Sequence, residues 1–260
     1  MSADQDYIAQ YRLDEIMDFS VKQKRDANFT VDPKNTETYP AGNKIGDLVR
    51  LHRLCISRRV TTVLEFGCGY STQILAHAMV HNTAQHGEFV KKNLRRNNPF
   101  EVHTIDDMPR YLDIVRERMT EPYKSRVTFY DSPVVMTKFN DRICTEYSRL
   151  PNVCPDFIYL DGPSQASVNG DINGITTDHP DRLPMACDIL KLEHFLLPGT
   201  LIVIDGRTAN ARFLKCNLQR NWAYRHDEES EVHLFELQER PLGRYNAKQL
   251  EYCLPEGFQL

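Results

Sequence analysis

The 260-residue sequence lacks any apolar run that approaches the length of a membrane span. A transmembrane helix needs about 20 consecutive, mostly apolar residues, so the sequence predicts a chain without membrane contact. Residues 1–6 are polar and acidic, so we also expect no signal peptide. The hydrophobic share of 41% and the charged share of 26% are those of a globular protein that buries a core.

A disulfide or zinc framework is also missing. The seven cysteines are odd in number and scattered, and no two of them form a C-x-x-C pair. Such usage favours reduced thiols and a cytoplasmic location. The net charge of −4 gives no general attraction to nucleic acid. The basic run 91–96 keeps a nucleic-acid interpretation open, although such a run more often forms the solvated face of a helix.

What the sequence does contain is a buried strand that ends in a glycine turn. Residues 60–66 are mostly apolar and predict a strand covered on both faces. The strand stops at Gly67-Cys68-Gly69, where the backbone can turn tightly. Ser71 suits the cap of the helix that follows. Strand, turn and helix N-terminus together predict a cradle for a nucleotide-like ligand.

Two details narrow the kind of ligand. Thr72 takes the third position of the dinucleotide fingerprint G-x-G-x-x-G/A, so the pyrophosphate pattern is broken. Glu65 places a carboxylate at the strand end, which would repel a phosphate and suits a cationic amino group. Residues 64–69 resemble the first motif of class I S-adenosylmethionine (SAM)-dependent methyltransferases. That resemblance implies SAM contacts at these residues: Glu65, Gly67, Cys68, Gly69 and Ser71.

Strands and helices alternate along most of the chain. The expected strands are 60–66, 100–105, 126–130, 156–161, 200–204, 222–226 and 232–237. The expected helices are 6–24, 43–58, one from residue 71 onward, an added one within 81–99, 108–121, 185–197 and 208–221. Residues 134–136 fit a short strand or a helix start, and 164–184 fit a long polar loop.

This order predicts an α/β fold, with a doubly wound, mostly parallel seven-stranded sheet and an antiparallel C-terminal edge hairpin. We expect three parts. Residues 1–42 would form an N-terminal helical arm or extension, residues 43–240 the SAM-binding domain, and residues 241–260 a tail that packs on the domain.

Four other predicted strands end in aspartate, at Asp106-Asp107, Asp131, Asp161 and Asp205. Any one of them alone is typical of a loop start. Because parallel strands end at the same edge of a sheet, and ligands bind at that edge, we expect these carboxylates to surround one crevice.

These strand ends extend the resemblance to methyltransferases over residues 45–206. The resemblance implies that Asp106 or Asp107 accepts the ribose hydroxyls, since a carboxylate has two acceptor oxygens. It also implies that Asp131 and Ser132 lie near the adenine.

Asp161 and Asp205 resemble the paired carboxylates that bind a divalent cation such as Mg²⁺ in catechol-type and sugar O-methyltransferases. A hard cation there would hold and acidify an acceptor hydroxyl. Gly206 stands where that family has a second Asp or Asn, and the family's usual lysine base is missing. Asp161 and His179 are the candidate catalytic residues, His179 because an imidazole titrates near neutrality.

The resemblance implies methyl transfer from SAM to a hydroxyl of a small molecule, such as a sugar or a secondary metabolite. The Asn/Asp-Pro-Pro-aromatic motif of DNA amino-methyltransferases is absent after the strand 156–161. An RNA or protein methyltransferase, or a methyltransferase-like binding module without catalysis, remains the alternative. The sequence is compatible with a homo-oligomer and does not define the methyl acceptor.

Overall fold

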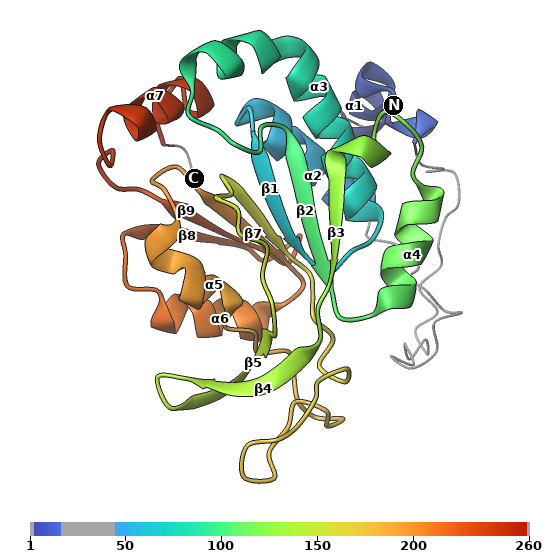
Figure 1. The fold of residues 1–260 in the computed structure, drawn as a ribbon, viewed down its shortest axis with the longest axis vertical. Coiled ribbons are helices and arrows are strands. Elements are labelled where there is room, and N and C mark those ends of the chain that lie inside the picture. Colours follow the sequence, from blue (N-terminus) through green and yellow to red (C-terminus); the bar gives the residue numbers. More distant parts are fainter. Residues whose placement is uncertain (1–2, 17–44, 259–260) are drawn as a thin grey trace.

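The computed structural model describes residues 3–16 and 45–258, and its centre is a seven-stranded sheet (Figure 1). The strand order is β3-β2-β1-β6-β7-β9-β8. These strands are β1 (Thr62–Phe66), β2 (Glu101–Asp106), β3 (Val127–Asp131), β6 (Phe157–Leu160), β7 (Leu201–Asp205), β8 (Trp222–Asp227) and β9 (Val232–Leu237). The first five run parallel, and β9 pairs antiparallel with both β7 and β8. The predicted doubly wound sheet with an antiparallel edge hairpin is confirmed.

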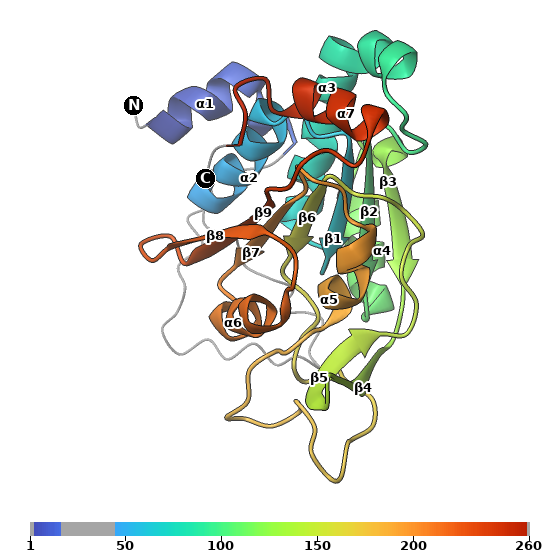
Figure 2. The ribbon, with the colours of Figure 1, turned by 90° about the vertical axis from the view of Figure 1, so that its left-hand side faces the viewer.

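Helices cover both faces of this sheet (Figure 2). The helices are α1 (Ala3–Tyr11), α2 (Ile45–Ser57), α3 (Tyr70–Asn93), α4 (Pro109–Arg118), α5 (Asp188–Leu192), α6 (Thr208–Asn217) and α7 (Arg244–Cys253). Short 3₁₀ turns are η1 (Leu13–Glu15), η3 (Lys124–Arg126) and η4 (Glu193–Phe195). Val63 packs with α2, α3 and α7, whereas its neighbour Leu64 packs with α5 and α6. Successive side chains of a strand point to opposite faces, so a continuous apolar strand fills two cores.

A second, two-stranded sheet occupies the stretch that the sequence left open. It consists of β4 (Val134–Phe139) and β5 (Arg142–Tyr147), paired antiparallel. Of the two interpretations of residues 134–136, the strand is therefore the one observed. Figure 1 shows this hairpin and the long loop below the ends of the central strands. A bridge between Val135 and Asn169 ties the loop to the hairpin.

Two helix predictions were wrong in their bounds. No separate helix follows α3, because α3 itself continues to Asn93 without a break. The helix expected over 185–197 is only α5 followed by η4. Its first residues instead pair with β5: Thr145 N–H donates to Met185 O at 2.8 Å, and Cys187 N–H donates to Thr145 O at 2.9 Å.

The N-terminal helix packs on α2 through the Tyr7 hydroxyl, which lies 2.9 Å from His52 Nδ1. The sequence predicted this helix over 6–24; α1 ends at Tyr11, and residues 17–44 lie outside the described part of the chain. At the other end, α7 packs against the turn before β7, where Asn246 Nδ2 donates to Pro198 O at 3.2 Å. Among the described helices, none is long and apolar enough to cross a membrane.

Candidate functional site

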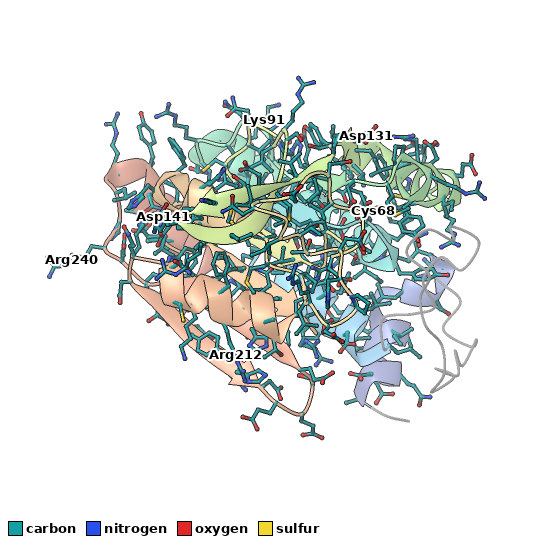
Figure 3. All side chains as sticks on the ribbon, turned by 90° about the horizontal axis from the view of Figure 1, so that it is seen from below. Cys68, Lys91, Asp131, Asp141, Arg212 and Arg240 are labelled. Atoms are coloured by element: carbon teal, nitrogen blue, oxygen red, sulfur yellow. The ribbon has the colours of Figure 1, made fainter. Side chains whose placement is uncertain are left out.

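The strand order places a topological switch point between β1 and β6. From β1 the chain proceeds to β2 and β3 on one side, and β6 and β7 lie on the other. In open α/β sheets this is where ligands bind, at the carboxyl ends of the strands. The turn after β1 reaches this point, and Figure 3 looks onto this edge of the molecule, with Cys68 and Asp131 labelled.

Gly67 and Gly162 bring two backbones into direct contact at this point. A Cβ on Gly67 would lie 2.7 Å from Gly162 N, and a Cβ on Gly162 would lie 2.6 Å from Gly67 Cα. Gly67 also has a φ of +89°, which a side chain rarely adopts. The absence of side chains therefore lets the turn after β1 rest on the end of β6.

Glu65 holds the N-terminus of α3 onto the strand. The Ser71 hydroxyl donates to Glu65 Oε1 and the Thr72 hydroxyl donates to Glu65 Oε2, both at 2.6 Å. The Glu65 side chain is fully buried, and this burial raises its pKa to about 7, opposed by the two hydroxyl hydrogen bonds. Both carboxylate oxygens thus have partners within the protein. Glu65 and Ser71 order the turn, and any contact with a ligand stays a prediction.

Asp106 fixes the same turn from β2. Its Oδ2 accepts from Cys68 N–H at 2.9 Å, and its Oδ1 accepts from Met108 N–H at 2.9 Å. Burial raises the pKa of Asp106 to about 6, against the opposing effect of the Cys68 hydrogen bond. The geometry therefore gives Asp106 a structural task, which is to link the two turns.

The neighbouring Asp107 has a carboxylate oxygen that can accept a further hydrogen bond. Its Oδ2 is buried and has no hydrogen-bond partner within residues 3–16 and 45–258. Burial raises the pKa of Asp107, while a hydrogen bond with Ser167 and the charge of Arg207 lower it. Of the two aspartates that the sequence offered for a ribose, Asp107 is the one with an oxygen that no described residue binds.

The next two predicted residues, Asp131 and Ser132, also differ in whether they are bound within the protein. Ser132 is buried, its Oγ accepts from Arg149 N–H at 2.9 Å, and its N–H donates to Asp106 O at 3.1 Å. Asp131 is exposed at the end of β3, paired in register with Asp106. Asp131 can therefore meet a ligand at the surface, whereas Ser132 supports the strand end.

Asp161 and Asp205 each face a guanidinium. Arg207 Nε lies 3.7 Å from Asp161 Oδ1, and Arg50 Nη2 lies 3.7 Å from Asp205 Oδ2. Tyr159 also donates to Asp205 at 3.5 Å. Divalent cations need several oxygen ligands free of competing positive charge. This arrangement does not fit a Mg²⁺ site, and no group of three metal-ligating side chains occurs in the described chain.

His179 lies in the long loop and is about half exposed. Its Nδ1 accepts from Asp181 N–H at 3.1 Å, which orders its own turn. No hydrogen bond connects His179 with the strand-end residues in the part of the chain that the structure describes. A role as a base therefore stays a prediction.

Three further residues at this edge were not predicted from the sequence. They are Tyr147 at the end of β5, Asp188 at the start of α5 and Arg207 after β7, and each has a buried polar atom without a partner among the described residues. Arg207 follows Asp205-Gly206 directly. The departure from the metal motif at Gly206 was therefore the sequence signal that lay beside Arg207. Tyr147 lies in the stretch without a clear period, and no sequence signal indicated it.

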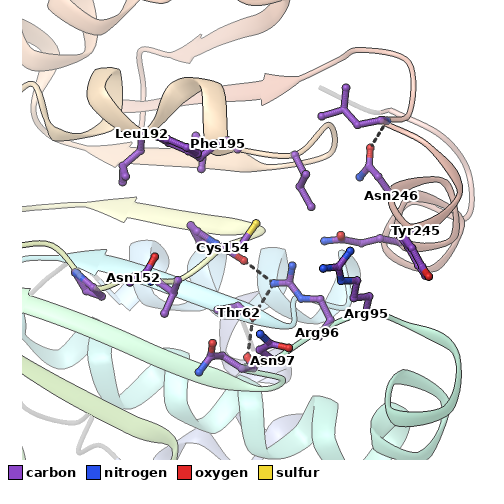
Figure 4. A pocket seen from close by; sticks show the side chains of 18 residues that line it. Thr62, Arg95, Arg96, Asn97, Asn152, Cys154, Leu192, Phe195, Tyr245 and Asn246 are labelled. Carbon is purple, nitrogen blue, oxygen red and sulfur yellow. Dashed lines mark hydrogen bonds between the residues drawn. The ribbon is translucent and has the colours of Figure 1, made fainter.

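A large cavity of about 690 Å³ lies at the opposite edge, where the strands begin (Figure 4). Arg96 forms part of its wall, with its guanidinium donating to Thr62 Oγ1 at 2.6 Å and Cys154 O at 2.9 Å. Arg95 lies over the Tyr245 ring at 5.4 Å. Both arginines of the basic run thus have partners in the protein, which favours a structural role for them over nucleic-acid contact.

Comparisons with known proteins give distant likenesses only. No protein-family model matches the sequence, and no curated protein matches it. The O-methyltransferase TomG from Streptomyces achromogenes, in complex with SAM, is 15% identical, with 76% of this chain and 82% of that chain covered and a TM-score of 0.42. The O-methyltransferase from Bacillus cereus, in complex with SAH, is 13% identical, with 90% and 99% covered and a TM-score of 0.43. The assignment of a function therefore rests on the residues of this chain.

Proposed function

We propose that this protein is a SAM-dependent methyltransferase that acts on a hydroxyl of a small molecule. The observation that carries the proposal is the glycine turn at the switch point, which Asp106 holds in place and beside which Asp107 Oδ2 has no hydrogen-bond partner among residues 3–16 and 45–258. A nucleoside bound at this edge would meet that oxygen with its ribose hydroxyls, because an ionised carboxylate accepts hydrogen bonds from both.

The first turn of α3 argues against a pyrophosphate. A helix N-terminus attracts anions through its free N–H groups and its dipole. Here the Glu65 carboxylate already lies against that turn, bound to Ser71 and Thr72. A phosphate would be placed beside this buried acid, so the site favours a nucleoside without phosphates, such as SAM, over a dinucleotide.

When bound, SAM supplies a methyl group on a sulfonium, which carries its own leaving group. The protein then has to hold the acceptor oxygen in line with that methyl group and to remove a proton. The strand ends on the β6 and β7 side of the switch point bear the groups for this, Asp161, Asp205 and Arg207. No step is assigned to a metal, because both carboxylates face arginines.

Calorimetry with purified protein tests the proposal. We expect heat of binding from SAM and from S-adenosylhomocysteine (SAH), and none from NAD at the same concentrations. Binding of NAD without binding of SAH would replace the methyltransferase with a dehydrogenase. SAH binding combined with the absence of methyl transfer to any acceptor would indicate a binding module instead.

A further inference from the structure

The cavity of about 690 Å³ at the edge where the strands begin is separate from the switch point (Figure 4). Its walls are the loop before β2, the segment before β6, η4 with the turn that follows it, and α7. Ligand sites are typically hollows of about 300–1,000 Å³ with a mostly apolar lining and a few polar groups. The size of this cavity therefore suits a small molecule.

Exposed apolar side chains gather around this cavity. Phe195, Leu242 and Tyr245 are 77%, 60% and 49% exposed, and all three line it. They are three of the eight large apolar side chains that are exposed in the described chain. Single exposed apolar residues are common on protein surfaces, whereas a group of them around a hollow indicates a binding surface. The ligand that fits this surface has an apolar body.

The charge of the lining is positive. Among the described residues, 18 line the cavity, and they include Arg95 and Arg96 but no aspartate or glutamate. Arg96 is bound within the protein, since its guanidinium donates to Thr62 and Cys154 and lies 3.8 Å from Asp156 Oδ1. Its charge is thereby compensated, and Arg95 is the arginine of the lining that is left to attract an anion.

Arg95 keeps its N–H donors available. It is exposed, and its partner is the face of the Tyr245 ring, which accepts none of these donors in the ring plane. Within residues 3–16 and 45–258, Arg95 has no ion pair and no side-chain hydrogen bond. Arg244 holds the same ring by donating to the Tyr245 hydroxyl at 3.0 Å. A guanidinium placed in this way can bind a carboxylate with two parallel hydrogen bonds.

Gln249 adds a polar group to the wall formed by α7. Its side chain lines the cavity and is only 7% exposed, yet its amide has no hydrogen-bond partner in the described chain. Asn246, one turn earlier, is fully engaged: Nδ2 donates to Pro198 O at 3.2 Å, and Oδ1 accepts from Leu242 N–H at 3.1 Å. Buried amides are usually hydrogen-bonded, so the Gln249 amide points to a polar group of a ligand.

We propose that this cavity is a second binding site, separate from the methyltransferase site, and that its ligand is a carboxylate with a flat apolar body. The carboxylate accepts from the Arg95 guanidinium, and the Gln249 amide binds a polar atom of the ligand. The rings of Phe195 and Tyr245 cover the apolar body, because aromatic faces and edges pack well on flat groups. One uncompensated arginine in the lining matches the single charge of a carboxylate better than the larger charge of a phosphate ester.

The test uses 2-naphthoate, which joins a carboxylate to a flat apolar body and whose fluorescence reports binding. We expect saturable binding of one naphthoate per chain, and at least about tenfold weaker binding of the neutral 2-naphthamide. Arg95→Gln should weaken naphthoate binding by about tenfold to a hundredfold, and Arg95→Lys by less. Lys91→Gln is the matched control, because Lys91 is an exposed cation of the same basic run that does not line the cavity.

A second variant separates ligand binding from a structural role. Gln249→Leu removes the amide without breaking a hydrogen bond of the described chain, so the midpoint of urea unfolding should not fall. The affinity for naphthoate should nevertheless drop by about twofold to tenfold. Asn246→Leu breaks both hydrogen bonds given above and should lower the midpoint. A lower midpoint for Gln249→Leu, with unchanged naphthoate affinity, would assign Gln249 to the fold and not to the site.

The remaining outcomes concern where the probe binds. A lack of saturable binding, or equal naphthoate affinity in wild type, Arg95→Gln and Lys91→Gln, overturns the second site. Competition between naphthoate and SAH, or a loss of naphthoate binding in Arg207→Gln but not in Arg95→Gln, would place the probe at the switch point and also overturn it. SAH binding and naphthoate binding are measured separately, so the second site and the proposed methyltransferase can each fail alone.

Discussion

Substitution of Gly67 by alanine should destabilise the protein more than an ordinary glycine substitution. The added methyl group would lie 2.7 Å from Gly162 N, 2.8 Å from Gly162 Cα and 2.9 Å from Asp161 C. All three are backbone atoms, so no side chain can rotate away. One of the two strand ends must therefore move.

The expected cost has two parts. A non-glycine residue in the left-handed region costs roughly 1–2 kcal/mol, and Gly67 has a φ of +89°. Forcing a methyl group into a packed position costs about 1–3 kcal/mol more. Together they give about 2–5 kcal/mol, a large part of the roughly 5–15 kcal/mol by which a folded domain is stable.

Gly170 provides the matched control. It has a φ of +79°, and a Cβ there would meet no atom within 4 Å. Gly170→Ala should therefore cost only the backbone part, about 1–2 kcal/mol. Urea unfolding of both variants measures the difference. Equal midpoints for Gly67→Ala and Gly170→Ala would show that the two backbones do not meet as described.

Three further outcomes follow from the structure. Burial lowers the pKa of His52 to about 3 and that of His77 to about 4. The free energy of unfolding should therefore be highest above about pH 6.5, and below that pH it should fall by about 1.4 kcal/mol per pH unit per histidine. In urea unfolding at several pH values, His52→Gln should flatten this slope; an unchanged slope would contradict the assignment. Methyl transfer, measured as SAH release, should continue in the presence of EDTA. A loss of activity that Mg²⁺ restores would refute the pairing of Asp161 and Asp205 with arginines. His179→Ala should keep its turnover, and a drop beyond tenfold would place His179 in the mechanism.

The fold was largely predictable from the sequence because its strands are buried on both faces. Continuous apolar runs such as residues 60–66 and 200–204 have few alternatives, and glycine or aspartate marks where they end. The hairpin of β4 and β5 was not predictable, because its two strands mix apolar and polar residues without a clear period. Their pairing depends on contacts with the long loop. The short length of α5 was not predictable for the same reason. Residues 185–187 form backbone hydrogen bonds with β5 and therefore do not start a helix.

The candidate site was predictable in position but not in the task of each residue. Acidic residues do gather at the predicted edge of the sheet. A sequence cannot show, however, which carboxylates are already bound within the protein, as Glu65 is by Ser71 and Thr72. The same holds for Asp106, whose oxygens accept from backbone N–H groups, whereas one oxygen of Asp107 has no partner in the described part of the chain. These assignments depend on side-chain orientation, which follows from packing.

The affinity of SAH for Asp107→Asn tests the account most directly. An amide keeps the size of the carboxylate and removes its charge, so a ribose held by Asp107 should bind about tenfold to a hundredfold more weakly in calorimetry. Asp141→Asn is the control, because Asp141 is exposed in the turn between β4 and β5 (Figure 3). We expect Asp107→Asn alone to lose affinity. Equal SAH affinity in wild type and both variants would contradict a cofactor site at this edge of the sheet.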